Sequence, residues 1–323
     1  MTRTTHFGRI SWLAAALIAA ALPCSAQAQQ DYPNRPIRLI VVAGEGGTTD
    51  RLARLISTRL TASFKQQVII DPRPGGSGII AAEITSRAKP DGYTLLLTYH
   101  AHTINAARND KLPYHVVNDF TPITQLVAAG SLLTVNPASP PKNLKEFIAW
   151  TRSHKVPLNA GTPGTGSGGY LAAEMYARMA GVNAQSINHP GSGKALIGLM
   201  AGDYHYAFTG MQGAMVQVRQ GRLRAIAVTT SKRMKALPDL PAIAEELPGF
   251  DVSGWWGVLA PPRLPKPLQT RLHEEIVKAL LTPEMRETIE ADGAEAVGNS
   301  PEEFRKVLLA DLQKWPQVIT KSR

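Results

Sequence analysis

Residues 37–60, IRLIVVAGEGGTTDRLARLISTRL, place three structural signals in one short stretch of the chain. The apolar run at 37–42 predicts a buried strand, and a glycine-rich turn follows it. After Asp50 the apolar residues recur at helical spacing; they are Leu52, Leu55, Ile56 and Leu60. The stretch therefore predicts strand, turn and helix, with unpaired N–H groups at the helix start that suit an anion.

The same unit recurs along the chain. Apolar segments at 67–71 and 92–98 lead into helical patterns, and a second series begins at 131–136. The segment GWWGVLAP, residues 254–261, is predicted to be the strand that returns the chain to the first series. Strands that alternate with helices predict an α/β fold with two lobes, each a mostly parallel sheet flanked by helices.

The first 28 residues have the features of a secretory signal peptide. A short basic segment precedes the apolar run ISWLAAALIAAAL, and Ala26-Gln27-Ala28 is a small-x-small cleavage site. A membrane anchor would need about 20 apolar residues. The single cysteine, Cys24, follows Pro23 rather than the small residue of a lipidation motif. We expect cleavage after Ala28, which leaves a mature chain without disulfides or a thiol nucleophile.

The charge of the chain is positive but dispersed. The sequence has 35 Lys and Arg against 25 Asp and Glu, a formal net charge of +10. These basic residues form no run interleaved with aromatic residues, which disfavours nucleic acid as a partner. A basic exported protein is compatible with the capture of small anions.

Glycine-rich turns are the features of this sequence best suited to binding a ligand. Four of them lie at 44–49, 75–78, 164–169 and 191–193. Ligands of open α/β sheets bind at the carboxyl ends of the strands, where these turns are expected. Any one turn can be a simple connector, whereas turns from two facing lobes can converge on one anion.

Enzyme and cofactor motifs are weak. Residues 164–169 match G-x-G-x-x-G, but a dinucleotide fold needs an acid about 20 residues on, where Ile187-Asn188-His189 stands. No serine lies in G-x-S-x-G, so a hydrolase elbow is not predicted. We expect no cofactor and no catalytic residue.

A pair of histidines and a pair of tryptophans can each be interpreted in more than one way. His100 and His102 follow a strand and could suggest a metal, but without a third ligand they are better explained as pocket or solvent-facing polar groups. We predict no metal site. Trp255 and Trp256 could stack on a ligand, although burial where the lobes join is favoured.

Five segments in order resemble the Bug family, the extracytoplasmic solute-binding proteins of tripartite tricarboxylate transporters. They are YPNRPIRLIVV, VIIDPRPGGSG, AKPDGYTLLL, LPYHVVNDFTPITQL and GRLRAIAVTTSKRMKALPDLPAIAEELPGF. The similarity runs from about Tyr32 almost to the C-terminus.

The resemblance implies a type II periplasmic-binding-protein (Venus flytrap) fold that closes on its ligand. We expect lobe 1 to comprise residues 29–128 and 252–323, and lobe 2 residues 129–251. The implied function is a periplasmic, monomeric receptor that delivers a small carboxylate, or a ligand with carboxylate and amide groups, to membrane permease subunits.

The resemblance also implies where the ligand binds. The family's first loop matches Ala43 to Thr49, and we expect binding groups from Ala43, Gly44, Glu45, Gly46, Gly47, Thr48, Thr49, Tyr99, His100, Thr165, Gly166, Ser167, Tyr170, His189 and Thr209. Several pocket positions depart from the family pattern. Glu45 stands where a proline is usual, Tyr170 where a histidine is usual, and Thr209 where an acid is usual.

Glu45 leaves three interpretations open, because a carboxylate beside a ligand carboxylate is costly without a cation or proton. It points to solvent or caps its own helix, it meets a cationic or N–H-bearing part of the ligand, or the ligand is not an ordinary dicarboxylate. Two other functions also stay open: a module that presents its ligand to a signalling partner, and an exported hydrolase or transferase on the same scaffold.

Overall fold

The computed structural model describes residues 32–44, 48–109, 111–164, 167–189, 191–291 and 293–319. The predicted signal peptide and its cleavage site lie outside these residues. Within them, no helix is both long enough and apolar enough to cross a bilayer.

The fold is built on two separate sheets. The first has six strands: Ile37–Val41 (β1), Val68–Pro72 (β2), Thr94–Tyr99 (β3), Thr121–Ala129 (β4), Gly254–Ala260 (β10) and Ala294–Ala296 (β11), in the order β11-β4-β10-β3-β1-β2. The second has five: Ser131–Val135 (β5), Leu158–Thr162 (β6), Ala184–Asn188 (β7), Tyr206–Gly210 (β8) and Arg224–Val228 (β9), in the order β7-β6-β8-β5-β9. We call the part on the six-stranded sheet lobe 1 and the other part lobe 2.

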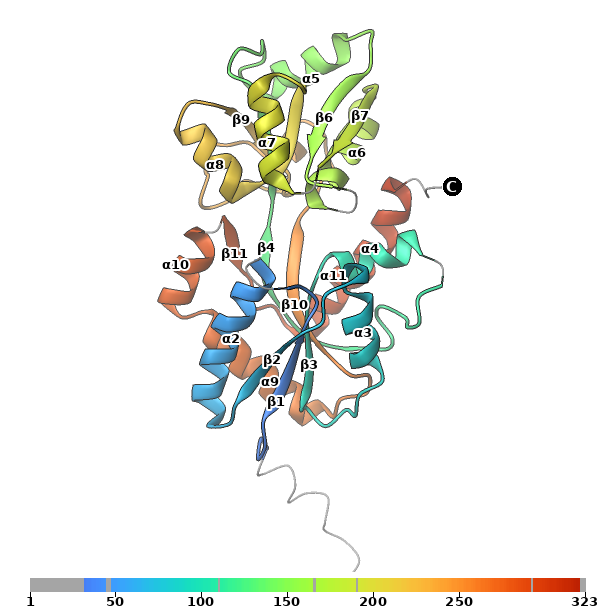
Figure 1. The fold of residues 1–323 in the computed structure, drawn as a ribbon, viewed down its shortest axis with the longest axis vertical. Coiled ribbons are helices and arrows are strands. Elements are labelled where there is room, and N and C mark those ends of the chain that lie inside the picture. The colour runs from blue at the N-terminus through green and yellow to red at the C-terminus, as the bar shows by residue number, and fades with distance from the viewer. Residues whose placement is uncertain are drawn as a thin grey trace, which may run out of the picture.

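Helices cover both sheets (Figure 1). Those of lobe 1 are Thr48–Phe64 (α2), Ile79–Ser86 (α3), Ala101–Arg108 (α4), Lys266–Leu280 (α9), Pro283–Ala291 (α10) and Pro301–Val318 (α11). Those of lobe 2 are Leu144–Ser153 (α5), Gly168–Ala180 (α6), Ser192–Ala201 (α7) and Met211–Arg219 (α8). The two-lobed α/β architecture predicted from the sequence is confirmed.

The sheets are mixed rather than mostly parallel. In lobe 1, β1 pairs in parallel with β2 and β3, whereas β10 runs antiparallel to both β3 and β4. In lobe 2, β6 pairs in parallel with β7 and β8, but β5 runs antiparallel to β8 and β9. The predicted parallel order fails where the chain changes lobe, because the strand that leaves a sheet and the strand that returns to it run in opposite directions.

The chain crosses between the sheets twice. It passes from β4 to β5 through Gly130, and it returns from β9 to β10. The buried hydroxyl of Thr229 joins the two passages, since it accepts from Ser131 N (2.8 Å) and donates to Val252 O (2.9 Å). The division of the mature chain at residues 128–129 and 251–252 into two moving units stays a prediction.

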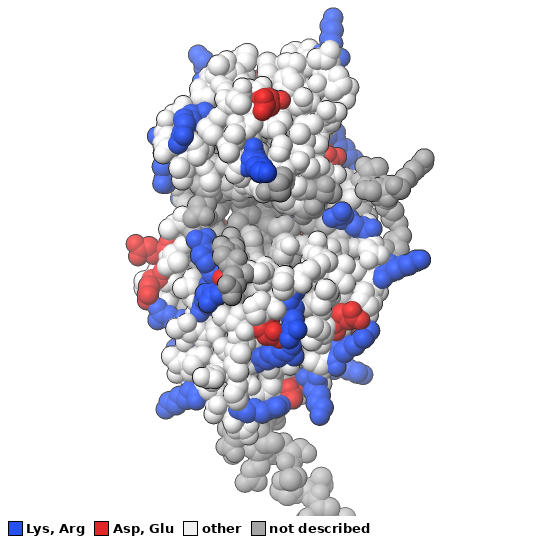
Figure 2. Space-filling view, viewed as in Figure 1, with Lys and Arg blue, Asp and Glu red and all other residues white. Residues whose placement is uncertain are grey.

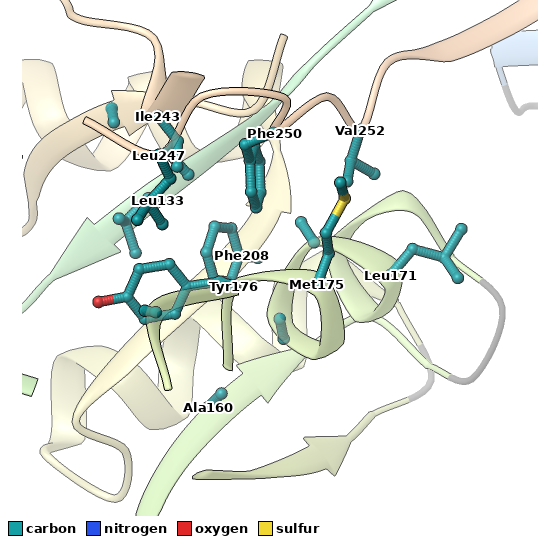
Figure 3. Packing of buried hydrophobic residues seen from close by; sticks show 14 of the residues in the cluster. Leu133, Ala160, Leu171, Met175, Tyr176, Phe208, Ile243, Leu247, Phe250 and Val252 are labelled. Atoms are coloured by element: carbon teal, nitrogen blue, oxygen red, sulfur yellow. The ribbon is translucent and has the colours of Figure 1, made fainter. Parts of the chain in front are cut away.

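One hydrophobic core reaches across the lobes. Phe208, Met175 and Phe250 lie within lobe 2, and Figure 3 shows Phe250 pointing toward Phe208. The same cluster includes Trp315 and Ile319 from the C-terminal end of α11 and its continuation. Helix α11 therefore packs on lobe 1 and also inserts its end into the core of lobe 2.

The residues at the start of α11 explain why the helix begins at Pro301. Ser300 accepts from Glu303 N at 3.2 Å, and the Glu303 carboxylate accepts from Ser300 N at 2.9 Å. Pro301 occupies the first turn, where a missing N–H costs nothing. This capping box fixes the start of α11 at Pro301.

Candidate ligand-binding site

Two adjoining cavities lie between the lobes. Cavity 1 has a volume of about 420 Å³ and cavity 2 of about 360 Å³. Their linings share His100, Pro163, Ser167, Gly168 and Trp256. Figure 2 shows the surface hollowed at the waist between the lobes, with Lys and Arg side chains scattered over this face rather than gathered.

Each lobe directs a helix N-terminus at cavity 1. Thr49, in the first turn of α2, lines it from lobe 1, and Ser167 and Gly168 line it from lobe 2. Ser167 is the N-cap of α6, and its Oγ accepts from Tyr170 N at 3.1 Å. Because the first N–H groups of a helix have no partner within it, both helix starts favour an anion placed between the lobes.

One face of α4 forms a wall of cavity 1. Ala101, Ile104, Asn105 and Arg108 line the cavity, at the three- and four-residue spacing of a single helix face. Of the described residues that line either cavity, Arg108 is the one with a charged side chain. Its guanidinium partly offsets the rise in the pKa of Tyr170 in lobe 2, a rise caused first by burial and then by Glu174. Arg108 thus acts electrostatically across the cleft.

His100 presents an uncharged imidazole to both cavities. The residue is 8% exposed, and its Nδ1 is buried without a hydrogen-bond partner among the described residues. A Cβ built on Gly254 would lie 3.1 Å from this Nδ1, so the glycine makes room for the ring. Burial lowers the pKa of His100 to about 4. The ring is therefore neutral at physiological pH and can offer a hydrogen bond without a charge.

Two aromatic side chains complete the wall. Tyr99 and Trp256 face each other across β3 and β10, and their rings stack at 6.3 Å with an interplanar angle of 28°. Trp256 Nε1 donates to Thr49 Oγ1 at 2.9 Å. The indole therefore holds the first turn of α2 and leaves only its ring surface for a ligand.

The two tryptophans have different positions. Trp255 is buried, as expected, but inside lobe 1 rather than where the lobes join, and its Nε1 donates to Asp311 Oδ2 at 2.8 Å. Trp256 lines both cavities, so burial where the lobes join was wrong for this residue. Alternation along β10 explains the difference, since neighbouring side chains point to opposite faces of a sheet.

The two histidines also lie in different surroundings. His102 is neither a pocket group nor exposed, which corrects our expectation: its ring stacks on Tyr114, packs edge-on against Phe120, and contacts Val116 O through Nε2 at 2.9 Å. On α4 it faces the interior of lobe 1. Among the described residues, no group of three or more His, Cys, Asp or Glu side chains could hold a metal ion.

The structure brings some of the predicted binding residues together. Ala43, Thr49, Tyr99, His100 and Ser167 line cavity 1. Gly44 is exposed beside Ala43, and Thr48 begins α2. Five predicted residues lie outside the described residues: Glu45, Gly46, Gly47, Thr165 and Gly166. The three interpretations of Glu45 therefore stay open.

Besides Gly44 and Thr48, three more of the predicted residues are absent from the linings of both cavities. Tyr170 lies in the first turn of α6, and His189 Nε2 contacts the Tyr204 hydroxyl at 2.5 Å. Thr209 is fully buried in β8 with its hydroxyl unpartnered within the described chain. Their roles in ligand binding stay predictions.

Sequence reasoning missed several lining residues. Ser77 and Asn105 line cavity 1, and Ser131 and Ser192 line cavity 2. Arg108 could have been found, because the helical spacing after His100 places Ala101, Ile104 and Arg108 on one face. The serines gave no comparable signal, since they become neighbours only when the sheets assemble.

Comparison with known proteins identifies the chain. A family model described as "Tripartite tricarboxylate transporter family receptor" matches residues 52–323. The chain belongs to this family. The protein BugT of Bordetella pertussis is 30% identical over 311 residues, which are 95% of this chain and 94% of BugT. The resemblance to the Bug family is thus confirmed.

Solved structures of receptors share the fold. An R. palustris protein solved with adipate is 31% identical, with a TM-score of 0.74 over 89% of this chain and 97% of its own. MatC of Rhodopseudomonas palustris, with bound malate, is 30% identical, with a TM-score of 0.71 over 90% of this chain and 100% of its own. The family consists of periplasmic solute-binding receptors, which supports a binding protein rather than an enzyme.

Proposed function

We propose that this chain is a periplasmic receptor that binds a small organic carboxylate between its lobes and delivers it to the membrane subunits of a tripartite transporter. The family of the chain supports a role in transport. The adipate and malate bound to two relatives support a carboxylate as the ligand class.

One observation in this chain supports the proposal most directly. Cavity 1 receives helix N-termini from both lobes, and the described residues that line it include Arg108 but no acidic side chain. A carboxylate there would accept hydrogen bonds from both sides of the cleft, each worth about 1.5–3 kcal/mol when one partner is charged. Donors on both lobes favour the closed form when the ligand is bound.

A thermal-shift screen tests the ligand class. The mature chain is heated with carboxylic acids and with the corresponding primary amides, which have the same shape without the charge. We expect acids to raise the melting temperature, since ligand at a hundredfold excess over Kd adds about 2.7 kcal/mol to the free energy of unfolding. Equal stabilisation by acids and amides would contradict an anion site.

A deletion strain tests the destination of the ligand. If the chain serves uptake, its loss abolishes accumulation of a labelled acid that the purified protein binds. Loss of gene induction with normal uptake would instead support the signalling alternative. N-terminal sequencing of the exported protein tests cleavage after Ala28.

A further inference from the structure

A buried carboxylate lies behind the wall of the ligand cavities. Asp311, on α11, is 4% exposed and lines neither cavity. Its Oδ2 accepts from Trp255 Nε1 at 2.8 Å and from Thr103 Oγ1 at 2.8 Å. A carboxylate is costly to bury unless hydrogen bonds replace those of water. These two bonds connect α11 to β10 and α4, beside which it runs in lobe 1 (Figure 1).

The two donors also hold the main chain of His100. The N–H of His100 donates to Trp255 O at 3.0 Å. The C=O of His100, the residue that precedes α4, lies 3.0 Å from Thr103 Oγ1 and accepts from Thr103 N at 3.2 Å. The four residues Asp311, Trp255, His100 and Thr103 therefore form a closed circuit of hydrogen bonds, which we call the Asp311 network.

The Asp311 network supports a side chain of the cleft from behind. The imidazole of His100 lines both cavities and packs edge-on against Trp256, with ring centroids 6.0 Å apart. It fits closely beside Gly254, the residue before Trp255, where a Cβ would lie 3.1 Å from Nδ1. Groups that bind a ligand need to be held to within about 0.5 Å by supporting hydrogen bonds. A shift of the main chain at His100 or Trp255 would move this imidazole in the cleft.

Apolar packing does not explain why residue 311 is an acid. Phe304 packs edge-on against Trp255, with ring centroids 5.2 Å apart, and Leu308 is fully buried about one turn before Asp311. These contacts already hold α11 on lobe 1, and well-packed apolar side chains often replace buried charges without loss of stability. An apolar side chain at 311 could not accept from Trp255 Nε1 and Thr103 Oγ1 together.

We propose that Asp311 is a positioning residue for ligand binding, which acts through Trp255 and Thr103 to fix the main chain of His100 and so the place of its imidazole in the cavities. The proposal rests on the proposed function, because it takes the two cavities as the ligand site. Since α11 also contributes Trp315 to the core of lobe 2, the carboxylate connects the cavity wall with the helix that reaches the other lobe.

The first test needs no ligand. Nuclear magnetic resonance of the mature chain with isotope-labelled histidine reports the imidazole of His100, whose signals are assigned by their loss in His100→Gln. We expect Asp311→Leu to shift these signals, because neither donor then has its acceptor. Asp311→Asn keeps one acceptor oxygen and should shift them less. The signals of His273, on α9, should stay in place in both variants.

The second test measures binding. Calorimetry uses adipate and malate, the acids bound to two relatives. We expect Asp311→Leu to weaken the binding of whichever acid the wild type binds roughly tenfold, because the imidazole is no longer held in place. Asp311→Asn should retain part of the affinity. Trp255→Phe, which keeps an aromatic ring but loses the N–H, should also weaken binding and serves if Asp311→Leu does not fold.

A control variant separates positioning from general damage to α11. Leu308→Ala removes a fully buried side chain from the same helix outside the Asp311 network, so it should lower the melting temperature. It should leave the His100 signals and the dissociation constant unchanged. The melting temperature of each variant without ligand reports folding.

The outcomes distinguish the two proposals. If folded Asp311→Leu leaves the His100 signals or the affinity unchanged, or if Leu308→Ala changes both as much, Asp311 only fixes the helix and the positioning role is wrong, while the receptor function stands. If the wild type binds neither these acids nor any carboxylate of the thermal-shift screen, the carboxylate function fails. The His100 signals alone then decide whether Asp311 positions the imidazole.

Discussion

At the scale of single residues, burial decides how the site's polar groups behave. His100 directly precedes α4 and His102 lies in its first turn, yet one faces the ligand cavities and the other the interior of lobe 1. Burial lowers the pKa of each to about 4. Both imidazoles are therefore neutral in the folded protein at pH values where an unfolded histidine begins to ionise.

This difference predicts a pH dependence of stability. Between pH of about 6.5, the usual histidine value, and about 4, the unfolded chain binds protons that the folded chain refuses, so the free energy of unfolding falls as pH falls. Each histidine contributes on the order of 2–3 kcal/mol over this window. Urea unfolding of His102→Phe should show a shallower pH dependence than the wild type. An unchanged slope would show that His102 is not the source.

Among the described residues that line cavity 1, Arg108 is the one that carries a charge. Arg108→Gln should weaken carboxylate binding roughly tenfold, or ~1.4 kcal/mol, because a partly exposed ion pair is screened by solvent. Arg108→Lys should retain part of the affinity, since it keeps the charge but loses the planar fork. Calorimetry with adipate or benzoate measures both. Arg222→Gln, on the surface of lobe 2, controls for net charge, and an equal loss there would refute a local role.

The positions of individual side chains were only partly predictable. The loop after β1 and the residues at the end of β3 were expected because strand ends in α/β sheets gather ligands. Thr209 is fully buried in β8 and is absent from both cavity linings, because a strand's register, invisible in one sequence, decides which face a residue occupies.

At the scale of elements, the two passages between lobes depend on one hydroxyl. Thr229→Val keeps the shape of the side chain but leaves Ser131 N–H and Val252 C=O without their side-chain partner. We expect a loss of about 1–3 kcal/mol in the free energy of unfolding, the usual cost of an unsatisfied buried group. Thr58→Val, an exposed helix position, should change it by less than ~0.5 kcal/mol. Similar losses in both variants would argue against a special role for Thr229.

Most elements were predictable because their signals are local. Apolar runs, glycine turns and helical spacing all lie within short windows of sequence. Strand direction was not, because β10 and β5 owe their antiparallel pairing to the path of the chain between lobes. The short strand β11 escaped notice, since three residues show no period.

At the scale of the whole molecule, the cleft predicts a change of shape on binding. A ligand that accepts from both helix starts favours closure, so the radius of gyration should decrease at saturation. Small-angle scattering of the mature chain with and without a binding acid measures this. A radius that stays constant while calorimetry shows saturation would mean that the free protein is already closed.

The two-lobed architecture, though not the bounds of the lobes as moving units, was predictable from the recurrence of one unit and the return segment GWWGVLAP. The continuous core between them was not, because only the assembled fold brings Trp315 to Phe250 and Met175.

Helix α11 gives this architecture a mechanical consequence. The helix packs on the six-stranded sheet of lobe 1, and its C-terminal end contributes Trp315 and the following Ile319 to the core of lobe 2. Because α11 packs against both lobes, the lobes can bend relative to each other but have little freedom to tumble independently. Spin-relaxation measurements should accordingly yield a single rotational correlation time for amides of both sheets, with or without cargo.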